Sequence, residues 1–324
     1  MQEINEALKQ THGRKSPAAA PNAGDGIIVV DKPAGKTSAA VVSRIKRLAG
    51  IKKVGHAGTL DPFATGVLIC PINRATRLSR FFLHGRKKYA GVLRLGTETD
   101  TLDRTGRVVA ESRVPDISTQ RIDDAVREFI GQIQQVPPAF SALKHNGVPL
   151  YKYARAGTPV EKPPRTVEIH DIRVTHVALP DIEFEVSCSG GTYIRTLCAD
   201  IAKSLGCGGH LKELARTESS GFSIEAAASL QDLEAVGTPA DLAPFVTPMA
   251  AALRGMPVHV ADETLAEKIR HGRPISERDL QPADAGAEDE KAGFVKITDR
   301  KNRLLAVIEK NRDKFAYSYC CVFH

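Results

Sequence analysis

The sequence has no tryptophan, only three methionines, and few aromatic residues, which make up 5% of its 324 residues. No apolar run approaches the ~20 residues that a membrane-spanning helix needs, so we expect no membrane insertion. Six scattered cysteines form no C-x-x-C pair, which predicts a cytoplasmic protein rather than a disulfide-stabilised one. Only Cys207 and His210 have a metal-ligand spacing; without a second pair we expect no metal site.

Several motifs of cofactor-dependent and hydrolytic enzymes are also missing. The sequence contains no G-x-x-x-x-G-K-[ST] loop, no G-x-S-x-G elbow and no H-E-x-x-H helix. It also lacks the H-x-E and P-C-x-x-C elements of zinc nucleobase deaminases. These absences exclude the corresponding chemistries, and we expect no cofactor.

Basic residues are concentrated in one segment. The chain carries 45 Lys and Arg against 38 Asp and Glu, a net charge of +7. Residues 44–94 contain twelve Lys or Arg and a single acid, Asp61. Such a concentrated positive charge favours a polyanionic partner, for example nucleic acid. The alternative explanation is a basic face that is only solvated.

Strand-like and helix-like segments alternate irregularly along the chain. Residues 1–25 end in a Pro/Ala/Gly stretch that predicts a flexible leader. Periodicity predicts strands at 26–31, 67–70, 89–95, 107–111, 167–177 and 182–188, and helices at 38–50, 75–83, 118–130, 150–156 and 192–205. Short strands then surround one helix at 264–271. The pattern predicts an α/β (α+β) fold, a mixed and mostly antiparallel sheet flanked by helices, followed by a small β-rich domain.

Asp61 and Arg195 are the first candidates for chemistry. An aspartate before proline in a Gly/Thr-rich loop is most often a turn former. Asp61 is also the only acid of the basic segment, and nearby cations would keep it ionised. Arg195 is the expected partner because a guanidinium orients a carboxylate as well as neutralising it; the alternative is a surface arginine at a helix start.

Two tyrosines and a histidine are candidates for contacts with a base. Tyr89 and Tyr193 could each stack on a base or pack as amphipathic core residues. His56 lies in the glycine-rich loop, where we expect it to be exposed and free to stack or to donate a hydrogen bond.

Residues 55–68, Gly-His-Ala-Gly-Thr-Leu-Asp-Pro-Phe-Ala-Thr-Gly-Val-Leu, resemble the signature loop of the bacterial TruB-type tRNA pseudouridine synthases. Further segments resemble that family in the same order: 31–38, 87–89, 137–147, 151–157, 191–195 and 209–216. The resemblance is strong over 25–250 and weaker over 255–324, which resembles the family's PUA-like RNA-binding domain. It implies a pseudouridine synthase catalytic domain at 26–252 and a PUA-like domain at 253–324.

The resemblance also implies an activity and a set of site residues. The expected reaction converts uridine 55 in the T loop of tRNA to pseudouridine after the base is flipped out. Asp61 matches the catalytic aspartate, Arg195 its partner, and Tyr89 the residue that stacks on the base and accepts the C5 proton. The residues matched to RNA binding are His56, Tyr193, Leu214, Lys32 and Lys88. A tRNA stem-loop is the expected partner of a monomer that needs no protein partner.

Two other functions remain open at this point. One is a guide-RNA-dependent relative of the same fold, and the other is a tRNA-binding or tRNA-folding module with secondary catalysis. The Asp-Pro-Phe-Ala-Thr-Gly sequence has the form found in stand-alone members of the family, and an intact Asp61, Tyr89 and Arg195 favour an active enzyme.

Overall fold

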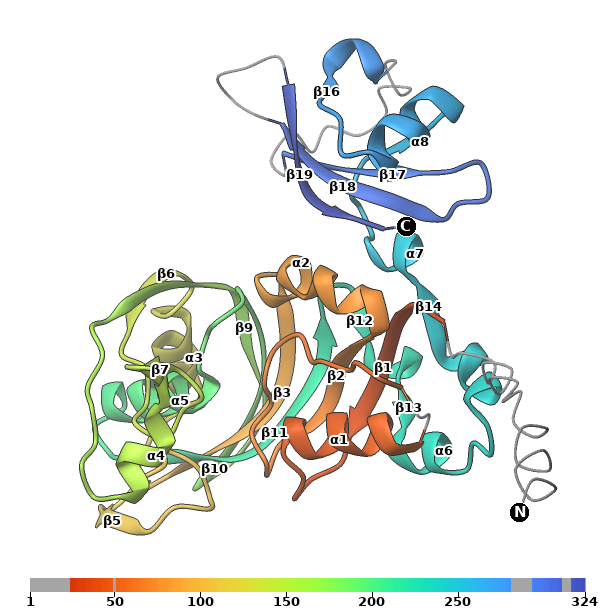
Figure 1. Cartoon of the computed structure of the whole chain (residues 1–324). Coiled ribbons are helices and arrows are strands. Elements are labelled where there is room, and N and C mark those ends of the chain that lie inside the picture. Colours follow the sequence, from red (N-terminus) through yellow and green to blue (C-terminus); the bar gives the residue numbers. More distant parts are fainter. Residues whose placement is uncertain (1–23, 49–50, 281–292, 311–315, 324) are drawn as a thin grey trace, which may run out of the picture.

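The chain folds around a large and a small β-sheet (Figure 1). The computed structural model describes residues 24–48, 51–280, 293–310 and 316–323. The predicted leader, residues 1–25, therefore lies almost entirely outside the described residues. No helix in these ranges is long and apolar enough to cross a membrane.

Ten strands form the large sheet, in the order β13-β1-β2-β11-β3-β10-β9-β6, with β12 beside β11 and β14 beside β1. The strands are β1 (Gly26–Lys32), β2 (Thr65–Ile72), β3 (Lys87–Leu95), β6 (Gly131–Gln135), β9 (Arg165–Ala178), β10 (Asp181–Cys188), β11 (Gly209–Ser219), β12 (Phe222–Ser223), β13 (Ala228–Ser229) and β14 (Val246–Pro248). Only β1 with β13 and β2 with β11 pair in parallel; the other pairs are antiparallel. The predicted fold class is confirmed.

The small sheet has five strands in the order β15-β17-β18-β19-β16. They are β15 (Val258–Val260), β16 (Ile275–Ser276), β17 (Phe294–Thr298), β18 (Leu304–Lys310) and β19 (Ala316–Val322). Two short hairpins lie outside both sheets: β4 (Thr97–Thr99) with β5 (Val108–Glu111), and β7 (Lys144–His145) with β8 (Val148–Pro149). The α-helices are α1 (Ser38–Leu48), α2 (Ser79–Leu83), α3 (Thr119–Arg127), α4 (Leu150–Arg155), α5 (Ile194–Ser204), α6 (Leu230–Glu234), α7 (Met249–Ala252) and α8 (Glu263–Arg270).

Strands β1 and β2 are buried on both faces, which explains their continuous apolar runs. On one face Ile28 and Leu68 pack against α1, through side chains such as Ile45. On the other face Ile27 and Ile69 belong to a second cluster, which extends to the small sheet. A strand has a side-chain period of two, so neighbouring residues of each strand feed different cores.

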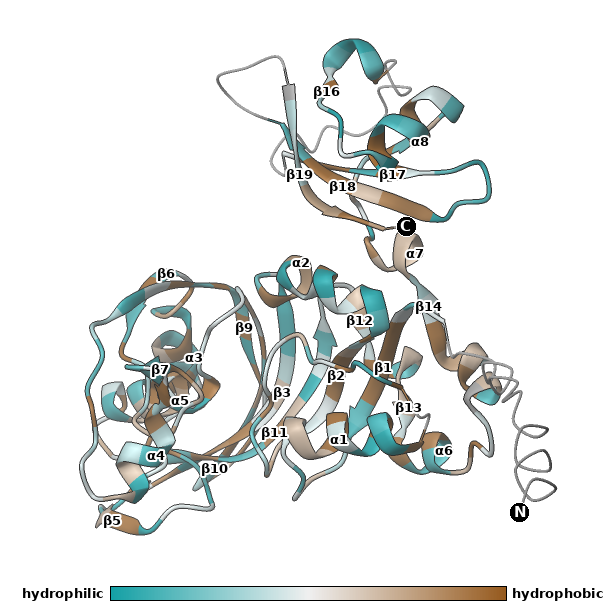
Figure 2. Ribbon diagram, in the orientation of Figure 1, coloured by the Kyte–Doolittle hydropathy of each residue, from teal (hydrophilic) through white to brown (hydrophobic). Residues whose placement is uncertain are grey.

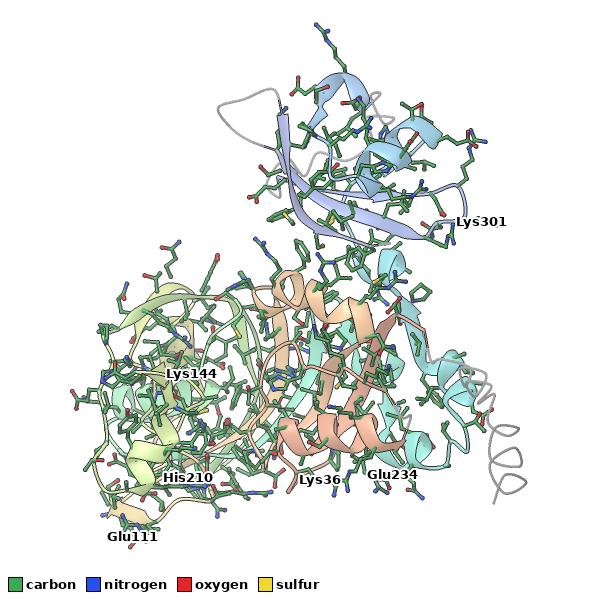
Figure 3. All side chains as sticks on the ribbon, in the orientation of Figure 1. Lys36, Glu111, Lys144, His210, Glu234 and Lys301 are labelled. Carbon is green, nitrogen blue, oxygen red and sulfur yellow. The ribbon has the colours of Figure 1, made fainter. Side chains whose placement is uncertain are left out.

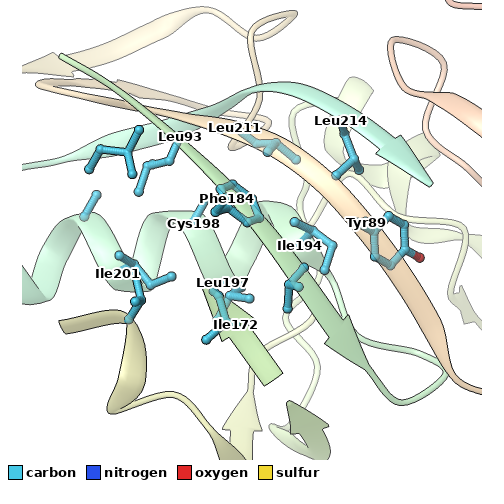
Figure 4. Packing of buried hydrophobic residues seen from close by; sticks show 14 of the residues in the cluster. Tyr89, Leu93, Ile172, Phe184, Ile194, Leu197, Cys198, Ile201, Leu211 and Leu214 are labelled. Carbon is cyan, nitrogen blue, oxygen red and sulfur yellow. The ribbon is translucent and has the colours of Figure 1, made fainter. Parts of the chain in front are cut away.

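The other end of the large sheet packs against α3 and α5. Leu93 of β3, Phe184 of β10 and Leu197 of α5 belong to one cluster of buried residues (Figure 4). Because residues along the length of α5 are buried in this cluster, its first turn is fixed against the large sheet.

The small sheet contacts the large one through aromatic and basic side chains. The rings of Phe81 and Phe294 meet edge to face at 5.3 Å, and Arg77 Nη1 donates to the carbonyl of Val322 at 2.5 Å. Hydropathy colouring shows hydrophobic residues along β18 in the middle of this sheet (Figure 2). Apolar packing therefore both fills the small sheet and joins it to the rest of the chain.

The sequence analysis assigns no strand to residues 209–219, yet they form the central strand β11. Polar residues interrupt its alternation, and three of them, His210, Arg216 and Ser219, are buried. His210 Nδ1 lies 2.7 Å from the carbonyl of Thr97, and Arg216 binds carbonyl oxygens described below. A buried polar side chain with a backbone partner hides the strand pattern from hydropathy alone.

Candidate active site

The loop that carries Asp61 is fastened to β2 of the large sheet on one side and to helix α1 on the other. Ala57 N donates to the carbonyl of Ile69 at 2.9 Å, which fixes the start of the loop on β2. Ser38 Oγ accepts from Leu60 N at 2.9 Å, immediately before Asp61. Gly58 has φ = 103°, a left-handed conformation that a glycine adopts without strain. These contacts hold the carboxylate in one place before any ligand binds.

Arg195 binds Asp61 in a bidentate manner. It lies in the first turn of α5 and is 3% exposed, so it is not the surface arginine of the alternative interpretation. Its Nε and Nη2 lie 2.9 Å and 3.2 Å from the two carboxylate oxygens of Asp61. Its remaining hydrogen bonds go to the carbonyls of Thr101, at 2.7 Å, and Phe140, at 2.9 Å. The guanidinium is thus fixed on several sides and orients the carboxylate.

Asp103 is a second carboxylate at this arginine, and the sequence analysis does not identify it. Its Oδ2 lies 3.7 Å from Arg195 Nε, and its Oδ1 accepts from Thr105 N at 2.9 Å and from Thr101 Oγ1 at 2.9 Å. The only sign of Asp103 in the sequence is its place in the Thr/Asp-rich segment 97–105. That segment has the composition of an ordinary turn, so it does not single out a site residue. Two carboxylates therefore share one buried guanidinium.

A cavity of about 490 Å³ lies in front of this pair. Asp61, Tyr89, Tyr193, Arg195 and Leu214 line it, so five of the predicted site residues come together. Tyr89 is 6% exposed, and burial raises the pKa of its phenol. Asp61 is the one acid among the lining residues. The cavity wall therefore presents a single carboxylate among positive side chains.

Three further cations line the same cavity: Lys87, Arg165 and Arg216. Burial lowers the pKa of Lys87 to about 8, and its Nζ donates to the carbonyls of Leu83 and Gly85. The guanidinium of Arg165 lies over the ring of Tyr193 at 4.6 Å. The sequence analysis misses these three residues because their burial follows from the strand register and not from local composition.

Lys32 does not reach the cavity, so the expected RNA contact is not supported. Its side chain is fully buried, and its Nζ donates to the carbonyls of Lys36, at 2.7 Å, and Pro62, at 3.2 Å. Burial lowers the pKa of Lys32 to about 8. An ammonium enclosed in this way holds the Asp61 loop and has no surface to offer a ligand.

Lys88 points away from the cavity because side chains alternate along β3. Its Nζ forms an exposed ion pair with Glu218 at 2.8 Å, while its neighbours Lys87 and Tyr89 face the site. His56 is half-buried rather than exposed, and burial lowers its pKa. Its Nδ1 has no hydrogen-bond partner among the described residues. The RNA-binding roles of Lys88 and His56 stay predictions.

Within the ranges that the structure describes, no group of three or more His, Cys, Asp or Glu side chains could hold a metal ion. A carboxylate clamped by a buried arginine, beside a buried tyrosine and within a ring of cations, defines a site for acid–base or covalent chemistry on an anionic substrate.

Comparisons with known proteins assign this site to a family. Residues 46–194 match the model of the TruB family pseudouridylate synthase N-terminal domain, and residues 195–254 match that of the tRNA pseudouridylate synthase B C-terminal domain. The tRNA pseudouridine synthase B of Syntrophotalea carbinolica is 45% identical over 77% of this chain and 81% of its own. That of Burkholderia pseudomallei is 41% identical over 87% of this chain and 92% of its own. The chain belongs to the TruB family of pseudouridylate synthases.

A solved structure agrees with this assignment. A chain from a crystal structure of a Cbf5-Nop10-Gar1 complex superposes with a TM-score of 0.72 at 26% identity, over 98% of this chain and 92% of its own. A chain from an H/ACA RNP bound to a substrate RNA containing 2′-deoxyuridine gives a TM-score of 0.69 at 27% identity, over 92% and 85%. The similarity covers the small sheet as well as the large one.

Proposed function

We propose that the protein is a tRNA pseudouridine synthase that converts uridine to pseudouridine at position 55, in the T loop. Family membership and the relatives' name, tRNA pseudouridine synthase B, support this assignment. The observation that carries the proposal is the bidentate contact between Arg195 and Asp61 at the wall of a cavity shared with Tyr89. This contact orients the carboxylate and aims it into a space of ligand size.

The reaction requires that the base leave its stack, at a cost of a few kcal/mol. In the proposed sequence Asp61 promotes cleavage of the bond between N1 and C1′, the base turns, and a bond forms between C5 and C1′. The C5 proton is then lost to Tyr89, and a proton is gained at N1. Because the product is an isomer of the substrate, no external oxidant, reductant or group donor enters the balance.

The cations around Asp61 suit an RNA substrate. Phosphate groups that flank the flipped nucleotide are attracted by Lys87, Arg165 and Arg216, whose charges exceed that of the single carboxylate. Tyr193 and Leu214 supply surfaces on which a base packs. Recognition by shape and stacking is the usual mode for an RNA loop.

We infer that residues 26–252 form the catalytic domain and that residues 253–324 form a PUA-like domain that contacts RNA outside the cavity. Asp61, Tyr89 and Arg195 come from one chain, which supports action as a monomer without a protein partner. The six cysteines are free thiols, four of them in the large-sheet part and two in β19, which supports work in the reducing cytoplasm.

Tritium release from tRNA that carries 5-tritiated uridine tests the proposal, with no guide RNA and no cofactor added. Wild-type protein should release tritium, and Asp61→Asn should not, although it should still bind tRNA. Release only when a guide RNA and partner proteins are supplied would favour the guide-dependent function of the H/ACA complexes. Binding of tRNA without release under either condition would leave a binding module.

A further inference from the structure

Arg216 is a buried arginine that the sequence analysis does not identify and that takes no part in the bond changes of the proposed reaction. It lies on β11 and is 1% exposed. Its Nε donates to the carbonyl of Val67 on β2 at 2.7 Å. Its Nη1 and Nη2 donate to the carbonyls of Thr59, at 3.4 Å, and Gly58, at 3.3 Å. One guanidinium thus joins the central strand, its neighbour and the loop that leads to Asp61.

The charge of Arg216 has no carboxylate partner at ion-pair distance within the described part of the chain. Three backbone carbonyls accept its hydrogen bonds, and a buried cation in such surroundings carries a desolvation cost that dipoles offset only in part. A neutral side chain with the same hydrogen bonds would serve a purely structural purpose at lower cost. The retained charge therefore indicates a group nearby that becomes negative.

Tyr89 is the group that the strand register brings to Arg216. The two residues are directly opposed across β11 and β3, and both line the cavity. The ring of Tyr89 lies at the edge of the packed cluster, and its oxygen points away from the aliphatic side chains (Figure 4). Burial raises the pKa of this phenol, while the charge of Arg216 and a hydrogen bond from it act in the opposite direction.

We propose that Arg216 is a positioning residue for the second half of the reaction, which holds Tyr89 at C5 of the rejoined base and stabilises its phenolate. The inference rests on the proposed function. In this step the phenol has first released its proton to water. The C5–H bond then breaks, its electron pair returns to the ring and restores the conjugated uracil, and the proton passes to the phenolate oxygen.

This assignment divides the two arginines of the site between two steps. Arg195 contacts the carboxylate that acts when the base is detached, and Arg216 lies opposite the tyrosine that acts when the C5 proton leaves. Loss of Arg216 should therefore slow proton removal more than base detachment. An isotope effect at C5 reports on that step alone, whereas a general loss of folded protein lowers all steps together.

The experiment compares single-turnover pseudouridine formation on tRNA that carries 5-deuterated or 5-protiated uridine. Arg216→Lys keeps a charge, and Arg216→Gln keeps two donors without a charge. We expect wild type to show a rate ratio near one, and both variants to be at least about tenfold slower with a ratio clearly above one, larger for Arg216→Gln. The double variant Arg216→Gln/Tyr89→Phe should be no slower than Tyr89→Phe alone, because the two residues serve one step.

Leu68→Ala is the matched control for a structural effect. Leu68 is fully buried on β2 next to Val67, and its side chain faces the other core. This variant should lose stability and keep the wild-type isotope ratio. Three outcomes would overturn the inference. They are an isotope ratio unchanged in both Arg216 variants, rate losses that multiply in the double variant, and failure of both Arg216 variants to fold. Absence of product with wild type would instead overturn the proposed function.

Discussion

The two sheets of the protein distribute charge in different ways. The large sheet encloses Lys32, Lys87, Arg195 and Arg216, each of which donates to backbone carbonyls. In the small-sheet part, several charges form pairs near the surface, such as Lys268 with Asp279 at 2.5 Å and Arg303 with Asp299 at 2.7 Å. Lys296 of β17 differs, since its Nζ donates to the carbonyls of Ala250 and Leu253. Lys301 lies at the exposed turn between its two long central strands (Figure 3).

This difference in charge placement indicates that the large sheet carries the chemistry and that the small sheet is built mainly for stable folding. Enclosing a cation without an ion pair lowers stability, and within the described residues Lys87 and Arg216 are enclosed in this way beside Asp61, which indicates that their charges act on a substrate. The core of the small sheet consists of aliphatic residues such as Ile297 and Ile308, and its surface pairs contribute little. A substitution should therefore affect catalysis in the first region and stability in the second.

The sharpest test of this contrast is Arg195→Lys. A lysine keeps the charge but loses the bidentate contact that orients Asp61, and a small misplacement at a reacting centre costs about 10²-fold or more in rate. We expect kcat to fall by that factor while the affinity for tRNA stays within about twofold, because the net charge of the cavity is unchanged. Single-turnover rates and filter binding measure the two quantities.

Arg303→Lys is the matched control in the small sheet. The Arg303 side chain is 75% exposed and pairs with Asp299 four residues away, so both kcat and the free energy of unfolding should change by little, within about 0.5 kcal/mol for the latter. Equal losses of kcat in the two variants would contradict the division between the regions.

Ile308→Ala should reverse the pattern. Ile308 is fully buried in the core of the small sheet, and truncation of such a side chain costs about 2–5 kcal/mol. Urea unfolding should show an earlier transition, while kcat at saturating tRNA stays near the wild-type value and KM rises. A loss of kcat as large as that of Arg195→Lys, with the large sheet still folded, would show that the small sheet takes part in the chemical step.

Much of the site could be predicted from the sequence because its residues lie in distinctive segments. Asp61 is the lone acid of a basic segment, and Arg195 follows a glycine-rich turn, although the fold joins them across 134 residues. The mixed sheet followed from the spacing of its strands. The resemblance to a known family added Leu214, and it assigned a role to Tyr89, for which composition left base stacking and core packing both open.

The residues that were missed owe their roles to tertiary packing. Asp103 lies in a segment with the composition of a turn, and only the fold brings it to Arg195. Register decides that Lys87 faces the cavity and that Lys88 faces away from it, although the two are adjacent in sequence. β11 was missed because its buried arginine resembles a surface residue until its carbonyl partners are known.

Asp279→Asn should have a smaller effect on stability than Ile308→Ala, and that effect should depend on pH. The ammonium of Lys268, followed by the backbone N–H of Ser276, lowers the pKa of Asp279 to about 2 from an ordinary value of 3.8. A lowered pKa of a carboxyl group in the folded state stabilises the protein at pH values above the group's ordinary pKa. This stabilisation is lost as the pH falls from about 4 to 2. The shift corresponds to at most about 2.5 kcal/mol, and screening by solvent reduces this to about 1 kcal/mol.

Urea unfolding of wild type and Asp279→Asn at pH 7 and pH 3 measures this contribution. The difference between the two proteins should fall to about half at pH 3, where the unfolded carboxyl is mostly protonated and the folded one is not. Added salt should reduce the difference at pH 7 as well, since the pair is near the surface. A stability difference independent of both pH and salt would show that Asp279 acts by capping residues 277–279 and not by its charge. The surface ion pairs of the small sheet would then add no more to stability than isolated exposed pairs do.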